Sequence, residues 1–178
     1  SLDVIFPVLH GPYGEDGTVQ GLLTALRIPF VGSRVLGSAI GMDKIVMKQV
    51  LRDAKIPIVN FLWYSKGDPL PDYSEIIGKL GSLVFVKPAN LGSSVGISKV
   101  SNEYELERAV ALAFRYDSKI IIEEAVSPVR ELECAVLVGK ELSISPPGEI
   151  VTSHSFYSYE AKYIDPNGTK YFIPAHVS

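Results

Sequence analysis

The stretch that decides the fold is Val84-Phe85-Val86-Lys87-Pro88-Ala89-Asn90-Leu91-Gly92-Ser93-Ser94-Val95-Gly96. Its apolar beginning predicts a buried strand over residues 83–87, and a second strand is expected over 96–100. Lys87 needs a partner for its charge, because desolvating an unpaired ammonium is strongly unfavourable. The loop between the strands offers backbone N–H groups and small hydroxyls, which suit a phosphate.

Two interpretations of this stretch stay open on the residues alone. Lys87 and the loop could bind a phosphate, or the two strands could form a simple hairpin whose lysine reaches the surface. Familiar phosphate motifs do not decide between them. The chain has neither a GxxxxGK[ST] sequence nor a GxGxxG sequence between a strand and a helix.

The sequence before this stretch predicts short alternating strands and helices. A strand is expected over residues 2–6, then the glycine-rich loop 10–17 and a helix. A further helix is predicted to begin near Asp43, whose carboxylate can accept backbone N–H bonds at that end. The expected buried stripe of this helix is Met47, Val50, Leu51 and Ala54.

The sequence after the stretch predicts one helix and several strands. The helix covers residues 102–115, with a capping box from Asn102 to Glu105. Its expected buried stripe is Leu106, Ala109, Val110, Ala113 and Phe114. Further strands are expected over 120–124, 131–138 and 141–144, and residues from 146 onward predict strands joined by a long ordered loop.

Composition and charge exclude several classes of protein. The 178 residues are 47% hydrophobic and 21% charged, which is typical of a globular protein rather than a disordered one. A net charge of −3 with dispersed basic residues gives no footprint for nucleic acid. No apolar run approaches the roughly 20 residues that span a bilayer. The single cysteine, Cys134, is expected to be a small buried hydrophobe, and it fits a reducing compartment.

Four motifs resemble, in order, those of the D-alanine–D-alanine ligases, a family with the ATP-grasp fold. They are His10-Gly11-x-x-Gly14-Glu15-Asp16-Gly17 with Gln20-Gly21, Met42-Asp43-Lys44, Val86-Lys87-Pro88 with Gly92-Ser93-Ser94-Val95-Gly96, and Tyr157-Ser158-Tyr159-Glu160-Ala161-Lys162-Tyr163. The resemblance covers essentially the whole chain and implies an α/β (α+β) protein. Residues 1–41 would be the C-terminal part of an N-terminal α/β domain, and residues 42–178 an ATP-grasp region, incomplete at its C-terminus.

The resemblance implies that this region binds ATP. Lys44 and Lys87 would contact the phosphates, with Ser93 and Ser94 beside them in the glycine loop. Two point charges against a polyanion are chemically sensible, because lysine can follow a phosphoryl group as it moves. Lys162 would reach the terminal phosphate from a mobile loop.

The same resemblance implies where the nucleoside would bind. Glu123 would accept a hydrogen bond from the adenine amino group, and backbone groups from Glu124 to Val126 would bond the edge of the base. Glu131 would accept the ribose hydroxyls, with Glu133 left as an alternative because the preceding segment is about one residue longer than the usual family spacing. Without the resemblance, Glu123 and Glu124 would be interpreted as the solvated end of a strand.

The D-alanine sites are also implied by the resemblance. His10 and Tyr157 would lie near them, and Ser93 would touch both the bound amino acid and Tyr163. Closure of the loop that carries Lys162 and Tyr163 would exclude water and protect an acyl phosphate, so Ser93, Lys162 and Tyr163 are the expected catalytic residues. Glu15 and Asp16 stay open, since they could cap the helix after residue 17 or touch substrate.

The implied reaction joins two D-alanines through a D-alanyl phosphate, with ATP converted to ADP, for peptidoglycan synthesis. Magnesium would bridge the phosphates, and its ligands are expected beyond residue 178. The chain is therefore expected to be an internal fragment, inactive alone, of a protein whose relatives are usually homodimers. Another ATP-grasp carboxylate–amine ligase and a nucleotide-binding module without catalysis are the alternatives.

Overall fold

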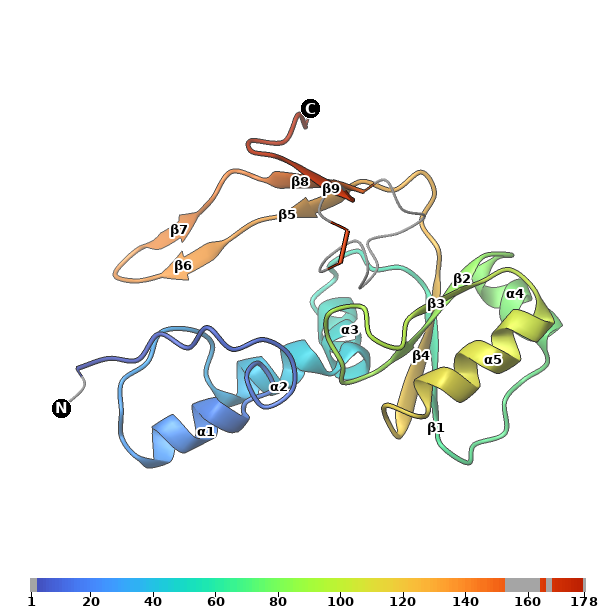
Figure 1. The fold of residues 1–178 in the computed structure, drawn as a ribbon, viewed down its shortest axis with the longest axis horizontal. Helices are drawn as coiled ribbons and strands as arrows, with labels where there is room; N and C mark the ends of the chain where they lie inside the picture. Colours follow the sequence, from blue (N-terminus) through green and yellow to red (C-terminus); the bar gives the residue numbers. More distant parts are fainter. Residues whose placement is uncertain (1–2, 153–163, 166–167, 178) are drawn as a thin grey trace. The chain divides into compact units, whose positions relative to one another are not determined.

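The computed structural model describes residues 3–152, 164–165 and 168–177 (Figure 1). The chain divides into two compact units, Ser1–Ala125 and Val126–Ser178. The first unit contains α1 (Thr18–Ala25), α2 (Val35–Met42), α3 (Lys44–Asp53), β1 (Phe61–Ser65), α4 (Tyr73–Leu80), β2 (Val84–Pro88), β3 (Ser98–Val100), α5 (Glu103–Ala113) and β4 (Lys119–Glu124). The second contains β5 (Glu131–Glu133), β6 (Val136–Val138), β7 (Leu142–Ile144), β8 (Gly148–Thr152) and β9 (Thr169–Phe172).

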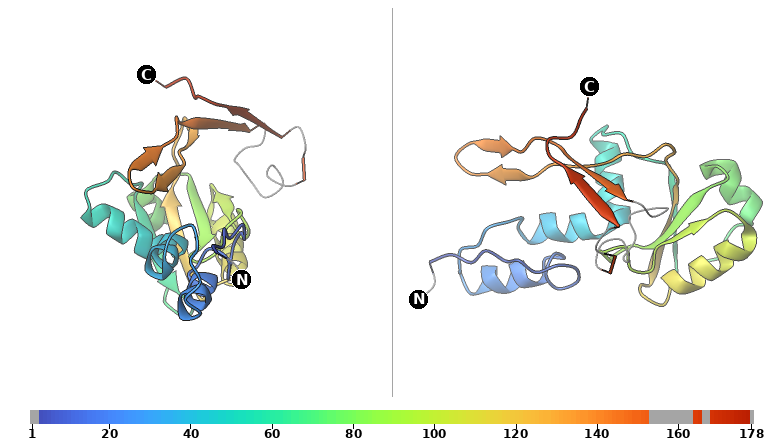
Figure 2. Two further views of the ribbon diagram at one scale, coloured as in Figure 1. Left: turned by 90° about the vertical axis from the view of Figure 1, so that its left-hand side faces the viewer. Right: turned by 45° about the horizontal axis from the view of Figure 1, so that its top comes forward.

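An antiparallel sheet of four strands is the frame of the first unit. Its order is β1-β4-β2-β3, so β4 lies between β1 and β2. Helices cover both faces, with α4 and α5 on one side and α3 on the other (Figure 2). Burial on both faces explains why β4 contains three isoleucines in succession, all fully buried, instead of an apolar–polar alternation.

The larger core lies between the sheet and helices α4 and α5. Its strand residues alternate, so that Val84 and Val86 of β2 and Ile120 and Ile122 of β4 all point to this side. The predicted stripe of α5 is confirmed. Leu106, Ala109, Val110 and Ala113 are buried, and Phe114 packs against the same cluster.

The predicted cap of α5 is confirmed at Asn102, whose side chain accepts a hydrogen bond from Glu105 N at 2.9 Å. The Glu105 carboxylate, however, accepts from the N–H and hydroxyl of Ser101, at 2.8 and 2.9 Å, rather than from the N–H of Asn102. Ser101 offers two donors where the backbone of Asn102 offers one. The reciprocal half of the capping box is therefore shifted by one residue.

Helix α3 begins where it was predicted, but its buried side differs. Asp43 caps the helix, with Oδ1 accepting from Ile45 N at 3.0 Å and Val46 N at 3.2 Å. The buried residues are Ile45 and Lys48, whereas Val50 from the predicted apolar stripe is 47% exposed. The predicted stripe is wrong for Val50 and Ala54, which are exposed, whereas Met47 and Leu51 are half-buried. Apolar periodicity takes no account of a lysine that is buried against a carboxylate.

The strand predicted over residues 2–6 is reduced to a single parallel bridge between Ile5 and Phe30. Ile5 N donates to Pro29 O, and Val31 N donates to Ile5 O, both at 2.9 Å. A strand needs a partner along its length, and within the described residues only this short segment pairs with it. The domain boundary predicted near residue 41 lies inside the first compact unit and stays a prediction.

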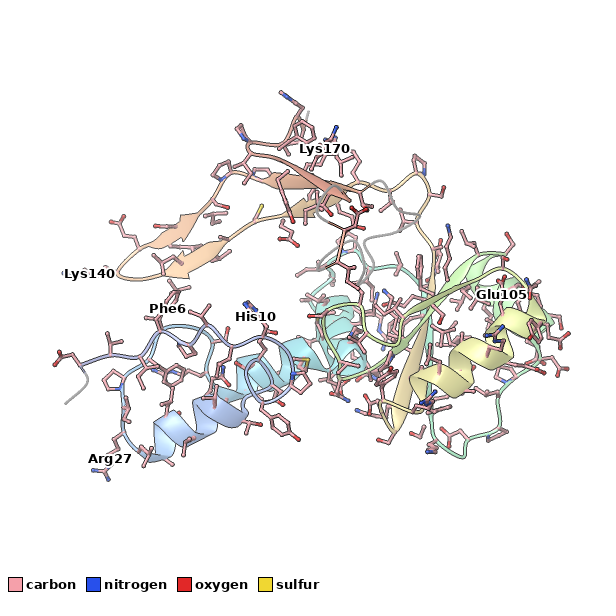
Figure 3. The ribbon with its side chains drawn as sticks, viewed as in Figure 1. Phe6, His10, Arg27, Glu105, Lys140 and Lys170 are labelled. Carbon is pink, nitrogen blue, oxygen red and sulfur yellow. The ribbon has the colours of Figure 1, made fainter. Side chains whose placement is uncertain are left out.

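The second unit is made of two small antiparallel sheets, β5-β8-β9 and β6-β7. The strand predicted over 131–138 is interrupted at Cys134 and Ala135, where the chain passes from one sheet to the other. Cys134 is exposed, so its predicted burial is wrong, because no helix of the described part of this unit covers these strands. Figure 3 shows Lys140 at the tip of the β6–β7 hairpin.

Candidate phosphate-binding site

Three lysines and one glutamate meet on the α3 side of the sheet. Lys44 and Lys48 are four residues apart, a spacing that places both on one face of α3. Lys87 comes from β2 and Glu123 from β4, which are neighbouring strands. Residues distant in sequence are thus brought together by one helix and two strands.

Glu123 is the centre of this cluster. Its Oε1 lies 2.9 Å from Lys48 Nζ, and its Oε2 forms an ion pair with Lys87 Nζ. The strand register places Glu123 between Phe61 of β1 and Phe85 of β2. The ammonium of Lys48 lies 5.5 Å from the centre of the Phe61 ring, and that of Lys87 lies 5.6 Å from the Phe85 ring, so each lysine also has a cation–π contact.

The electrostatics of the cluster favour an anionic ligand. Burial raises the pKa of Glu123, but the charges and hydrogen bonds of Lys87 and Lys48 outweigh burial and hold that pKa below its ordinary value. Burial, followed by the charge of Lys87, lowers the pKa of Lys44 from 10.5 to about 8. Among the described residues Glu123 is the carboxylate that pairs with Lys48 and Lys87, while Asp117 and Asp43 also act on the charge of Lys44. A bound polyanion would add negative charge beside all three ammonium groups.

The glycine loop beside the lysines is anchored at its base. Asp117 Oδ2 accepts hydrogen bonds from Asn90 N at 2.7 Å and from Asn90 Nδ2 at 3.0 Å. Lys44 Nζ donates to the carbonyls of Ala89 at 3.4 Å and Leu91 at 2.5 Å. The ammonium of Lys44 is therefore held against the backbone at the start of the loop.

The tip of the loop has an unusual backbone. Ser93 and Ser94 have φ values of 55° and 60°, and Val95 N donates to Gly92 O at 3.2 Å. Positive φ costs a non-glycine residue on the order of 1–3 kcal/mol, and such residues concentrate at functional sites. The conformation of the two serines therefore supports the expectation that this loop binds a ligand.

The turn at Gly96 leads to a stability prediction. Gly96 has φ 71°, and an added Cβ would lie 2.8 Å from both Pro88 Cγ and Tyr116 Cδ2. Gly96→Ala is expected to destabilise the protein by about 1–3 kcal/mol, measured by thermal or urea unfolding. Gly92→Ala is the control, because a Cβ there meets only Gly11 Cα, at 4.0 Å. Equal destabilisation by the two substitutions would contradict this explanation.

A cavity of about 670 Å³ adjoins the cluster within the first unit. His10, Glu15, Lys44, Leu91 and Gly92 are among its lining residues. Figure 3 shows His10 on the loop that precedes α1. The cavity brings the predicted substrate residue His10 together with the predicted phosphate residue Lys44, although the two are 34 positions apart in the sequence.

Glu15 and Asp16 both stabilise the loop before α1. Asp16 Oδ1 accepts from Thr18 N at 2.9 Å and Oδ2 from Tyr13 N at 2.8 Å, and these hydrogen bonds, that of Tyr13 first, lower the pKa of Asp16. Glu15 Oε2 accepts from Gly11 N at 2.5 Å. Asp16 thus bonds the first N–H of α1, although Gly17 is the N-cap residue, and Glu15 both closes the loop and lines the cavity. Whether either carboxylate also touches substrate stays open.

Comparison with known proteins identifies the family. Residues 50–178 match the family model described as D-ala D-ala ligase C-terminus, and residues 1–33 match D-ala D-ala ligase N-terminus. The chain belongs to the D-alanine–D-alanine ligase family. It is 55% identical over 182 residues to a D-alanine–D-alanine ligase of Bradyrhizobium sp. (strain ORS 278), and 50% identical over 176 residues to that of Proteus mirabilis (strain HI4320).

These alignments cover 99% and 98% of this chain but 49% and 48% of the two relatives, so the chain spans about half the length of the curated ligases that it matches. Two solved ligase structures are also similar to this chain in sequence and fold. The D-alanine–D-alanine ligase from Coxiella burnetii is 42% identical with a TM-score of 0.80, over 87% of this chain and 47% of that one. The VanG D-Ala:D-Ser ligase from Enterococcus faecalis is 37% identical with a TM-score of 0.86, over 99% and 51%. The predicted ATP-grasp fold is confirmed.

The residues expected to bind the nucleoside in this ligase-family chain lie in and after β4. The N–H groups of Glu124 and Ala125 donate to Asn60 O and Leu83 O, so both are committed to the sheet. The expected contact of the stretch from Glu124 to Val126 with the edge of the base stays a prediction, and these two hydrogen bonds favour Val126 within it. The Glu124 carboxylate accepts from Asn60 Nδ2 at 2.9 Å, which is a structural contact.

The choice between Glu131 and Glu133 for the ribose stays open. Both belong to β5 and, being two residues apart, project from the same face of that strand. Glu131 is half-buried opposite Ile150, whereas Glu133 is exposed opposite Gly148. Neighbouring Arg130 is engaged elsewhere, because it forms a bidentate ion pair with Glu149 at 2.7 Å.

Several features expected of the ligase family lie outside the described residues or are not found among them. Tyr157, Lys162 and Tyr163 belong to the segment 153–163, which the structure does not describe, so their roles stay predictions. Within the described ranges, no group of three or more His, Cys, Asp or Glu side chains is arranged to hold a metal ion. No helix in the described part of the chain is long and apolar enough to cross a membrane.

Lys48 is the member of this buried cluster that the sequence did not predict. The interpretation treated α3 as an amphipathic helix and assigned its buried face to apolar residues only. The Lys44-to-Lys48 spacing was a usable signal, because two lysines on one helical face, beside a loop that suits phosphate, indicate a shared anionic partner. Asp117, which anchors Asn90, carried no comparable signal because its partner is 27 residues away.

Proposed function

We propose that the protein containing these residues ligates two D-alanine molecules to D-alanyl-D-alanine, with ATP converted to ADP and phosphate through a D-alanyl phosphate, for peptidoglycan synthesis. The observation that carries the proposal is the convergence of Lys44, Lys87 and the strained glycine loop in a chain of this family. ATP and D-alanine are the proposed small-molecule substrates, and the reaction would take place in the cytoplasm, where ATP is available. A homodimer stays a prediction.

The phosphates are the part of the substrate for which the first unit is best suited. Lys44 and Lys87 would neutralise the charge that moves from the attacked phosphoryl group to the leaving oxygen, while Ser93 and Ser94 fix the loop around it. Positioning is the main contribution of such groups, because phosphoryl transfer needs little covalent chemistry from the protein. His10 would contact D-alanine in the adjoining cavity.

The remaining roles are proposed on the family resemblance. Glu123 can accept from the adenine amino group in addition to its two lysine contacts, since each carboxylate oxygen has two lone pairs. Glu131 is proposed for the ribose, and Lys162 with Tyr163 for closing the site over Ser93. Magnesium is expected to accompany ATP, but the described residues supply no cluster of side chains to hold it. The proposed roles are therefore limited to side chains and backbone groups of the protein.

One assay tests the proposal. The full-length protein is incubated with MgATP and, in turn, D-alanine, D-serine, D-lactate and L-alanine, and phosphate release and the ligated product are measured. Phosphate release that requires D-alanine, with D-alanyl-D-alanine as product, is the expected result. Faster ligation of D-alanine to D-serine or D-lactate would assign another acceptor. ATP binding without any effect of the amino acids would leave only a nucleotide-binding role.

The lowered pKa of Lys44 predicts a pH dependence of ATP binding. In the free protein its pKa is about 8, and a bound phosphate would raise it, so binding should take up a proton near and above pH 8. The dissociation constant for ATP is therefore expected to rise by up to about tenfold per pH unit above pH 8. Calorimetry in buffers of different ionisation enthalpy measures the proton uptake. Lys44→Arg should flatten the profile, because arginine stays charged.

A further inference from the structure

We infer that Lys48 is a positioning residue, which acts through Glu123 to keep the Lys87 ammonium available to the phosphates of ATP. The inference rests on the proposed function, since it assigns a role within the same site. The observation behind it is the continuous chain of ion pairs from Lys48 to Oε1 of Glu123, and from Oε2 of Glu123 to Lys87.

The exposed fractions of the three side chains show which member of the ion-pair series a ligand can reach. The Lys48 side chain is 9% exposed and that of Glu123 is 7% exposed, whereas Lys87 is 24% exposed. Lys87 is therefore the member that a ligand can reach, and Lys48 lies behind it. The ammonium of Lys48 is also held over the Phe61 ring, on the far side of Glu123 in the strand register from Phe85 and its lysine.

The physical role of Lys48 follows from the sharing of one carboxylate. With both lysines present, each carboxylate oxygen has its own ammonium, and the single negative charge neutralises neither lysine completely. Without Lys48, the whole carboxylate charge would act on Lys87. That ammonium would be drawn more tightly to Glu123 and would offer less positive charge to a phosphate, so ATP would bind more weakly.

A double-mutant cycle tests this role in the full-length protein, with MgATP binding measured by titration calorimetry. Lys48→Met is expected to raise the dissociation constant about tenfold when Lys87 is present, but less than about twofold in a Lys87→Met background. Lys48→Gln, which keeps a hydrogen-bond donor but no charge, is a second variant should the methionine protein fold poorly. Arg52→Met is the control, because it removes a positive charge from an exposed position of the same helix.

Each outcome of the cycle either supports or overturns the positioning role of Lys48. Loss of affinity that disappears when Lys87 is absent supports the positioning role. An equal loss in both backgrounds overturns it, because either a direct phosphate contact or a general structural effect of Lys48 would be additive with Lys87. Unchanged affinity in the Lys48 variants also overturns it, while leaving the proposed function intact. Failure of the wild-type protein to bind ATP would reject both.

Discussion

Lys87→Met in the full-length protein is expected to lower kcat/KM for ATP by about 100- to 1000-fold, the usual loss when a group that stabilises transition-state charge is removed. Methionine keeps the unbranched shape of the lysine stem but has no charge, so the substitution tests the ammonium itself. Lys87 is the most exposed member of the buried ion-pair chain. Steady-state phosphate release at varied ATP concentration is the measurement.

Lys79→Met is the matched control for this experiment. Lys79 is an exposed lysine on α4, which covers the opposite face of the same sheet. Its loss removes the same formal charge from the molecule and should change kcat/KM less than about twofold, because exposed charges are screened by solvent and salt. A loss of less than tenfold in Lys87→Met, with a melting temperature close to that of the wild type, would contradict a phosphate role for this residue.

Glu123→Leu is expected to destabilise the protein by about 3–5 kcal/mol, which is the cost of leaving one partner of a buried ion pair uncompensated. The substitution leaves the ammonium groups of Lys48 and Lys87 close together on the sheet, without the carboxylate that now lies between them. Urea unfolding near neutral pH is the measurement. The expected value is this large because the side chains of this ion pair are less exposed than those of ordinary surface pairs.

Glu124→Leu is the control for this substitution, and the pH dependence of the stability difference separates the effect of charge from that of packing. Glu124→Leu removes a half-exposed carboxylate that bonds to Asn60 and should cost about 1 kcal/mol or less. Because the pKa of Glu123 is lowered in the folded protein, its contribution is present above the ordinary glutamate pKa and is lost as pH falls through the lowered value. The difference between wild type and Glu123→Leu should therefore shrink in acid. A constant difference would show that lost packing, not charge, is responsible.

The local elements were predictable where short-range chemistry decides them. The Asn102 cap, the apolar stripe of α5 and the start of α3 at Asp43 all follow from contacts within one or two helical turns. The strand over residues 131–138 was not, because its division depends on β5 pairing with β8 and β6 with β7. Pairing between distant strands is not encoded in the alternation of a single strand.

The candidate site also combines residues that the sequence predicted with contacts that only the structure shows. The sequence alone supplied Lys87 and the Gly92-Ser93-Ser94 loop, and the order of four motifs supplied the family. It left open whether the lysine faced a phosphate or the solvent. The structure shows the surroundings of Lys87 in the free protein. The strand register places Glu123 opposite Phe85, its carboxylate pairs with Lys87, and the packing of α3 adds Lys48.

What the sequence determined by itself is the membership of the D-alanine–D-alanine ligase family and the ATP-grasp fold, and it predicted a phosphate loop between residues 84 and 100. What only the tertiary structure decided is the electrostatic environment of that loop. Burial of a charge depends on which opposite charge lies within a few ångströms, and that partner can be 75 residues away, as Glu123 is from Lys48. Pattern and propensity act over a few residues, whereas Coulombic pairing acts through space.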